Sequence, residues 1–385
     1  MRVAIAGSGA LARYLCEELT RGGHELVVLT RSYKPQLEHP MVTQFITDYT
    51  LQSLSTPLAN CQVLISTILD YSSVYVDIHR TLIEACQQSP QCKRFIPSEF
   101  GGNLEDYPDQ PGFYFRTRDP IRQILREQQD LEWTLVSVGW LIDYVIPAKN
   151  RYLYDIGEAF PINLAENKIL IPGSGKEAVN ITWARDVAKA LSALVSAPTW
   201  EPYTYITGEQ TCWNDVANII RQRYGPGMQT EHRTLYQLLE TLKESKDETA
   251  LLIAEYQIFS VARAGALPQD KPLKSTPKVT NVALPGSTSS KHMPHSVASI
   301  ICSEDNGALQ PRDPALSCVE FRYGPTPSPD GPGCRHRIDV AVCNGGPAAS
   351  PCITNHLGVL QNSCRGFSPA GDMLRNLDVH PMQET

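Results

Sequence analysis

The chain has 385 residues, enough for one large domain or two. Its 34 basic and 41 acidic residues give a formal net charge of −7, and the sequence lacks the basic face expected of a nucleic-acid-binding protein. It contains no apolar run long enough to cross a bilayer, and Met1-Arg2 leads straight into a strand rather than a signal peptide. We expect a cytoplasmic protein with a small-molecule substrate and no direct nucleic-acid or membrane partner.

The N-terminal residues predict a dinucleotide-binding strand–turn–helix–strand unit. The turn from Gly7 to Ala12 reads Gly-x-Gly-x-x-Ala and joins an apolar strand to an amphipathic helix. Gly7 permits the sharp turn, Gly9 permits close approach of a pyrophosphate, and the small Ala12 allows the helix to pack on the strand. The free N–H groups of the helix then point at the phosphates. The expected cofactor-binding residues of this turn are Gly7, Ser8, Gly9, Ala10, Leu11 and Ala12.

The end of the second strand indicates which dinucleotide binds. It reads Leu29-Thr30-Arg31-Ser32 and has no Asp or Glu to accept hydrogen bonds from a ribose 2′-hydroxyl. A guanidinium such as that of Arg31 can instead hold a 2′-phosphate through two hydrogen bonds. We therefore expect NADP(H), with Arg31 and Ser32 among its contacts.

Strands and helices continue to alternate after this unit, which predicts a parallel sheet covered on both faces. Further strands are expected at 43–46, 61–67, 93–96 and 133–138, and helices at 73–87 and 121–128. The predicted fold is therefore a Rossmann-type doubly wound α/β sheet. Thr67, at the end of the fourth strand, is expected beside the nicotinamide-side ribose. Trp140, Asp143 and Tyr144 follow the sixth strand at its carboxyl end, where such sheets bind ligands, and are candidate pocket walls.

Three segments are expected along the chain: an NADP-binding core over 1–145, a smaller substrate lobe over 146–271 that returns to the core, and a tail over 272–385. The tail holds fourteen of the 29 prolines, six of the eleven cysteines and none of the five tryptophans. It has no hydrophobic periodicity and no Cys-x-x-Cys pair, so we expect a disordered or aberrant segment, such as a gene-model artefact, and no metal site.

Several stretches within residues 1–271 resemble the NmrA-like and isoflavone-reductase-like proteins, which are atypical short-chain dehydrogenases. The most specific is Arg94-Phe95-Ile96-Pro97-Ser98-Glu99-Phe100-Gly101, and 182–188 and 203–208 resemble later elements of the same fold. Fungal members that occur in secondary-metabolite pathways are the most similar. The resemblance implies an NADP-dependent oxidoreductase and places Pro97, Ser98, Glu99 and Phe100 near the cofactor, with Glu99 in structural hydrogen bonds.

The chain departs from this family at the catalytic lysine of the reductase branch, where Arg118 stands instead. Arginine stays charged in proteins, so it can hold an oxyanion or the cofactor but cannot transfer a proton. Tyr114, four residues earlier, is then the candidate proton donor, in an echo of the Tyr-x-x-x-Lys pair of ordinary short-chain dehydrogenases. Thr117 or Asp119 resembles a helix N-cap, with Pro120 in the first turn, so Tyr114 is expected to precede the helix.

Three functions remain open at this stage. The first is NADP(H)-dependent reduction of a carbonyl, imine or alkene in a small apolar metabolite. The loss of the lysine also suits a redox-neutral isomerase or cyclase that retains NADP. The NmrA resemblance also implies a non-catalytic NADP-sensing regulator with a protein partner.

Overall fold

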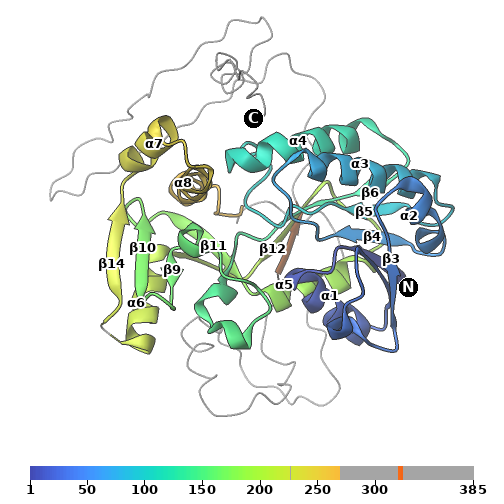
Figure 1. Ribbon diagram of the computed structural model, residues 1–385, viewed down its shortest axis with the longest axis horizontal. Coiled ribbons are helices and arrows are strands. Elements are labelled where there is room, and N and C mark those ends of the chain that lie inside the picture. The colour runs from blue at the N-terminus through green and yellow to red at the C-terminus, as the bar shows by residue number, and fades with distance from the viewer. Residues whose placement is uncertain (226, 269–319, 324–385) are drawn as a thin grey trace, which may run out of the picture. The chain divides into compact units, whose positions relative to one another are not determined.

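The first part of the chain builds one parallel sheet, as the computed structural model in Figure 1 shows; the structure describes residues 1–225, 227–268 and 320–323. The six strands lie in the order β3-β2-β1-β4-β5-β6, and every neighbouring pair is parallel, as in a Rossmann fold. The elements of this part are β1 (Arg2–Ala6), α1 (Ala10–Arg21), β2 (Glu25–Thr30), β3 (Val42–Ile46), α2 (Leu51–Leu58), β4 (Val63–Ser66), α3 (Ser73–Gln88), β5 (Arg94–Ile96), α4 (Gly112–Glu127) and β6 (Glu132–Trp133).

Helices cover both faces of this sheet because alternate residues of each strand point to opposite sides. On β1, Val3 and Ile5 pack in a cluster with α1 and α5 (Ala184–Leu194). Ala4 and Ala6 pack in a second cluster with α2, α3 and α4. Figure 1 shows α1 and α5 on one side of the strands and α3 and α4 on the other.

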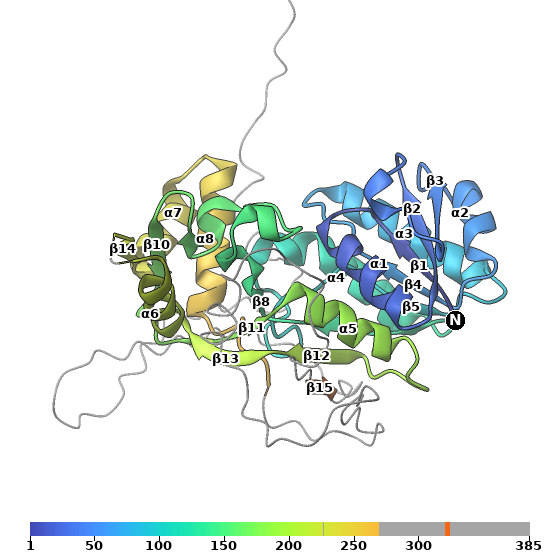
Figure 2. The same cartoon turned by 90° about the horizontal axis from the view of Figure 1, so that it is seen from below.

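The remaining strands form separate sheets of three strands each, and the elements after β7 build a second lobe. Strand β7 (Leu135–Ser137) pairs with β12 (Tyr203–Thr207), which also pairs with β15 (Glu320–Tyr323). Figure 2 shows the helices of the lobe gathered away from the six-stranded sheet. Its core is built around Trp140, Phe160, Trp213 and Phe259. The other elements are β8 (Trp140–Leu141), β9 (Ile162–Asn163), β10 (Lys168–Pro172), β11 (Ala178–Thr182), β13 (Glu209–Cys212), α6 (Trp213–Tyr224), β14 (Gln229–Arg233), α7 (Leu235–Glu244) and α8 (Glu248–Val261).

After α8 the chain returns to the sheet through a short strap, residues 264–267. The Asn103 N–H, in the loop after β5, donates to the Ala264 carbonyl at 2.8 Å. Asn180 on β11 binds the strap twice: its N–H donates to the Gly265 carbonyl, and its Oδ1 accepts from the Leu267 N–H, both at 2.8 Å. Leu267 is buried in the cluster under α3 and α4. The strap therefore joins α8 to both parts of the fold.

The structure confirms the predicted fold class and corrects one helix. The helix expected at 121–128 begins at Gly112, so Tyr114 lies inside it rather than before it. Helix α2 and strands β8, β9, β11, β13 and β14 were not predicted.

The expected boundary between 145 and 146 stays a prediction, because every described residue belongs to one structural unit, Met1–Thr326. The expected tail, 272–385, lies outside the described residues apart from Glu320–Tyr323. In the described part of the chain, no helix has both the length and the apolar character needed to span a bilayer.

Candidate functional site

The turn between β1 and α1 has the shape that a pyrophosphate requires. Gly7 has φ 103°, and a Cβ there would lie 2.8 Å from Thr67 Oγ1, so the turn runs against the loop after β4. Gly9 is the N-cap of α1 and supplies no side-chain cap, and a Cβ on it would meet nothing within 4 Å. The first turn of α1 also has no acidic residue. This uncapped helix start with open space beside it fits a phosphate group. The first turn consists of Ala10, Leu11 and Ala12.

The predicted residues at the end of β2 lie next to this turn. The hydroxyls of Ser8 and Thr30 are hydrogen-bonded at 2.8 Å, which ties the glycine turn to β2. Arg31 and Ser32 follow and are exposed. The guanidinium carbon of Arg31 lies 5.9 Å from the centroid of the Tyr49 ring, and within the described ranges Arg31 makes no ion pair. The guanidinium is therefore accessible to a 2′-phosphate.

The Pro97–Phe100 segment follows β5 and is anchored to α4. Both carboxylate oxygens of Glu99 accept from Arg122, at 2.8 Å from Nε and 2.9 Å from Nη2. The two side chains are 4% and 1% exposed. Glu99 therefore holds this loop against the helix, and its carboxylate is not free to act as a general acid. Ser98 is also buried, and its carbonyl accepts from the Tyr75 hydroxyl at 3.1 Å.

Helix α4 brings the two predicted catalytic residues together. Its N-cap, Pro111, has no side chain that can cap it, and the carboxylate of Glu255 on α8 accepts from the Phe113 N–H instead. Because the helix begins this early, Tyr114 and Arg118 stand one turn apart on it. The guanidinium carbon of Arg118 lies 4.4 Å from the centroid of the Tyr114 ring.

Arg118 is buried, at 1% exposure, at the carboxyl end of β4. Its Nη1 donates to the Asp70 carbonyl at 2.7 Å and to Thr117 Oγ1 at 2.5 Å. Its guanidinium carbon also lies 3.8 Å from the centroid of the Tyr75 ring. Its Nε and Nη2 are buried and have no hydrogen-bond partner in the described structure. The guanidinium of Arg118 therefore has two hydrogen-bond donors, Nε and Nη2, without an acceptor in the described structure.

The hydroxyl of Tyr114 belongs to a group of three tyrosines. It is hydrogen-bonded to the Tyr256 hydroxyl at 2.9 Å, and Tyr256 in turn lies 3.4 Å from the Tyr71 hydroxyl. Burial and Tyr71 raise the pKa of Tyr114, whereas the Arg118 charge and the Tyr256 hydrogen bond lower it, and the net shift is upward. Tyr114 is therefore a neutral phenol whose proton is available for donation.

Sequence reasoning missed Tyr71 and Tyr256. Tyr71 follows β4 at its carboxyl end, where ligand-binding loops of open sheets lie, and this position could have suggested it. Tyr256 lies on α8, 142 residues from Tyr114, and no local pattern marks it.

His79 lies near the predicted catalytic residues, and its ring is stacked on that of Tyr75 with centroids 3.7 Å apart. Burial lowers its pKa to about 3. It is therefore neutral and is not a proton source at ordinary pH.

Two of the three expected pocket-wall residues belong to the core instead. Trp140 is 5% exposed and packs edge-on against Trp213 at 5.7 Å. Asp143 is 3% exposed, and its Oδ2 accepts from the Ala184 N–H at 2.8 Å, which caps α5. Tyr144 is half-buried, with its ring 4.9 Å from that of Phe160.

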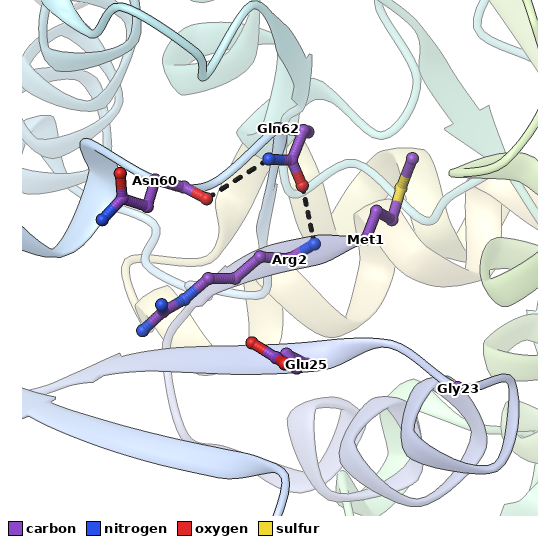
Figure 3. Close-up of a pocket in the computed structure, with 6 residues that line it drawn as sticks. All are labelled: Met1, Arg2, Gly23, Glu25, Asn60 and Gln62. Atoms are coloured by element: carbon purple, nitrogen blue, oxygen red, sulfur yellow. Dashed lines mark hydrogen bonds between the residues drawn. The ribbon is translucent and has the colours of Figure 1, made fainter.

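A pocket of about 420 Å³ lies at the other end of the sheet. The residues that line it in Figure 3 are Met1, Arg2, Gly23, Glu25, Asn60 and Gln62. The Arg2 N–H donates to Gln62 Oε1 at 2.6 Å across it. Because Arg2 and Glu25 begin their strands, the pocket lies at the amino ends, whereas open α/β sheets bind ligands at the carboxyl ends. We therefore place the candidate site at the glycine turn and α4. No cluster of three or more metal-ligating side chains occurs within the residues described.

Comparison with known proteins supports a nucleotide site in this region. Residues 6–161 match the NAD(P)H-binding family model. The chain is 56% identical over 273 residues to "Oxidoreductase swnR" of Arthroderma benhamiae, a match that covers 70% of this chain and 90% of the relative. It is 22% identical over 255 residues to "Isoflavone reductase homolog A622" of Nicotiana glauca, covering 62% of this chain and 79% of that protein.

Among solved structures, the fold resembles the binary complex of leucoanthocyanidin reductase with NADPH from Vitis vinifera. The TM-score is 0.56 at 16% identity, and the alignment covers 71% of this chain and 90% of that one. At this level of identity the likeness concerns the fold.

Proposed function

Because the chain belongs to the NmrA-like and isoflavone-reductase-like family of NAD(P)H-binding oxidoreductases, we propose that it is an NADP(H)-dependent reductase in secondary-metabolite biosynthesis. Its substrate class is a small, mainly apolar molecule with a carbonyl, imine or alkene group. The observation that carries this proposal is the Tyr114–Arg118 pair on α4, which joins a proton donor to a buried cation beside the loop after β4. The sequence resemblance to fungal family members supports the metabolic role.

The choice of NADP(H) over NAD(H) rests on the end of β2. Arg31 is exposed and unpaired within the described residues, and no carboxylate stands at this strand end to repel a 2′-phosphate. The N–H groups at the start of α1 would hold the pyrophosphate, and Thr67, which donates to the Ala6 carbonyl at 3.1 Å, lines the side nearest β4.

The bound cofactor supplies a hydride, and the protein must supply a proton to the atom that gains the electron pair. Tyr114 donates that proton from its hydroxyl. Arg118 stabilises the negative charge that develops on the phenol oxygen, and the hydrogen bond from Tyr256 does the same. The half-buried setting of Tyr114 and Tyr256 limits competition from water at this point.

The test is the consumption of NADPH by the purified full chain. Four probe electrophiles cover the proposed class: acetophenone and its carboxylate-bearing analogue phenylglyoxylate as carbonyls, methylpyrroline as a cyclic imine and cinnamaldehyde as a conjugated alkene. We expect loss of NADPH absorbance with at least one probe and none without a probe. A chain that binds NADPH but reduces no probe contradicts the proposal. Isomerisation of a probe with NADP⁺ alone would favour the redox-neutral alternative.

A further inference from the structure

Two buried arginines on α4 differ in whether a carboxylate pairs with them. Arg118 and Arg122 stand one turn apart and are each 1% exposed. Arg122 is neutralised by Glu99 through two hydrogen bonds. Arg118 makes no ion pair in the described part of the chain, and its charge acts on the Asp70 carboxylate only from beyond ion-pair distance. A buried charge without a counter-ion is costly, so an unpaired guanidinium at a candidate active site indicates that the anion arrives with a ligand.

The carboxylate of Asp70, whose carbonyl accepts from Arg118, is hydrogen-bonded to other groups. The Asp70 carboxylate accepts from the Ser72 N–H at 2.8 Å and from the Ser72 hydroxyl at 2.6 Å. It offers Arg118 only its main-chain carbonyl, which occupies Nη1. The edge formed by Nε and Nη2 is left without a partner, and this edge matches the two oxygens of a carboxylate.

We propose that the Nε–Nη2 edge of Arg118 binds a carboxylate of the substrate, so that the substrate is a small carboxylate-bearing electrophile. This inference rests on the proposed function, because it assigns a group of the molecule that is reduced. A carboxylate on Arg118 would hold the neighbouring electrophile close to Tyr114, whose ring centroid lies 4.4 Å from the guanidinium carbon. The half-buried ring of Tyr114 supplies an apolar contact for the rest of the molecule.

The substrate is a better source of this anion than the cofactor. The pyrophosphate is assigned to the uncapped start of α1, and the 2′-phosphate to the exposed Arg31. Each phosphate therefore already has donors of its own, after β1 and after β2, and Arg118, which binds the Asp70 carbonyl in the loop after β4, is needed by neither. Because Nε and Nη2 are covered in the structure, a neighbouring side chain must move to admit the carboxylate. Tyr71 is 42% exposed and lies next to Asp70, so it is the least enclosed of the surrounding tyrosines.

The experiment compares benzoate with benzamide, which has the same shape and no charge, in titrations of the full chain saturated with NADP⁺. We expect the wild-type chain to bind benzoate in preference to benzamide. Arg118→Met should weaken benzoate binding by roughly tenfold or more, because a charge-assisted bidentate contact is lost. Its affinities for benzamide and for NADP⁺ should stay within about twofold of wild type, because neither uses this edge.

Arg122→Met is the matched control for folding. It leaves Glu99 buried without a partner and should lower the urea midpoint of unfolding more than Arg118→Met does, because Arg118→Met leaves no buried acid unpaired. If Arg118→Met does not fold, Arg118→Lys is the second variant. Lysine keeps the positive charge but lacks the paired N–H donors of the guanidinium, so benzoate binding should again be weaker than in the wild-type chain.

Three results would overturn the inference. The wild-type chain could fail to bind benzoate, or Arg118→Met could bind benzoate as tightly as the wild-type chain does. Arg118→Met could also lose affinity for NADP⁺ and not for benzoate, which would assign the anion to the cofactor. Failure of the wild-type chain to bind NADP⁺ would instead contradict the proposed function. Titration of the cofactor-free chain with benzoate would then still test Arg118.

Discussion

Tyr114 shows how a single residue acquires chemistry from its surroundings. Burial raises its pKa and keeps the phenol protonated, and in the proposed mechanism Arg118 and Tyr256 stabilise the phenolate that forms when the proton leaves. Arg118 could be found from the sequence because it stands in a motif-bearing region at the position of a known catalytic lysine. Tyr256 could not, because its contact with Tyr114 spans 142 residues and depends on how α8 docks.

We expect Tyr114→Phe to lower kcat for any probe that the chain reduces by about 100-fold or more, because general acid catalysis contributes on this order. NADPH affinity should be unchanged, since the missing hydroxyl is not a cofactor contact in the proposed site. Stopped-flow kinetics and a fluorescence titration would measure the two quantities. Tyr144→Phe is the control, because Tyr144 packs against Phe160 in the second lobe. Equal rates in the two variants would exclude Tyr114 as the proton donor.

At the scale of elements, α4 explains the one wrong helix boundary. Thr117 or Asp119 followed by Pro120 is typical of a helix start, yet α4 runs through them from Gly112. The early start depends on the Glu255 carboxylate, which caps the Phe113 N–H from another helix. A cap supplied by a residue distant in sequence leaves no local signal. By contrast, α1 was predictable because its glycines, its buried stripe and its flanking strands are contiguous.

Two glycine substitutions separate cofactor binding from folding. Gly9→Val should lower NADP⁺ affinity by about tenfold or more and lower Tm less than Gly7→Ala, because its Cβ enters open space beside the start of α1. Gly7→Ala should lower Tm, because φ is 103° there and the Cβ would lie 2.8 Å from Thr67 Oγ1. Calorimetric titration and thermal melts would distinguish the two. Unchanged NADP⁺ affinity in Gly9→Val would mean that the turn does not hold the cofactor.

The cap of α5 predicts a pH dependence of stability. Burial raises the pKa of Asp143 to about 6, above its ordinary value, so the folded state favours the protonated form. Its contribution to stability is therefore complete below about pH 4 and is lost as the pH rises through about 6, by roughly 3 kcal/mol in all. Asp143→Asn should remove this component, because an amide does not titrate and can still accept from the Ala184 N–H. Urea unfolding across this pH range would measure it, and parallel curves for the two proteins would contradict the assignment.

At the scale of the whole molecule, the alternation of strands and helices predicted the Rossmann sheet, because each parallel strand needs a crossover helix before the next. The second lobe was less predictable. Its strands are short, as with β8 (Trp140–Leu141) and β9 (Ile162–Asn163), and they pair with partners far along the chain. A strand of two residues is too short to show in the sequence the alternation of apolar and polar side chains that indicates a strand.

The nucleotide-binding surface as a whole sets the preference for NADP⁺ over NAD⁺, which can be measured as the ratio of the two affinities. Arg31→Ala should weaken NADP⁺ binding by roughly tenfold or more and leave NAD⁺ binding unchanged, because only NADP⁺ carries the 2′-phosphate. Titrations of both nucleotides into the wild-type chain and the variant would show it. A wild-type chain that prefers NAD⁺, or an Arg31→Ala chain that keeps its preference for NADP⁺, would reject Arg31 as the selecting residue.

The strap at 264–267 limits how the protein can open. Asn103 binds the strap through its main chain, and Asn180 binds it through its main chain and its side chain, so the segment after α8 is held to the loop after β5 and to β11. A hinge that swung the second lobe away as a rigid body would have to break these bonds and withdraw Leu267 from the core. Substrate exchange should therefore proceed without a rigid-body separation of the second lobe from the six-stranded sheet.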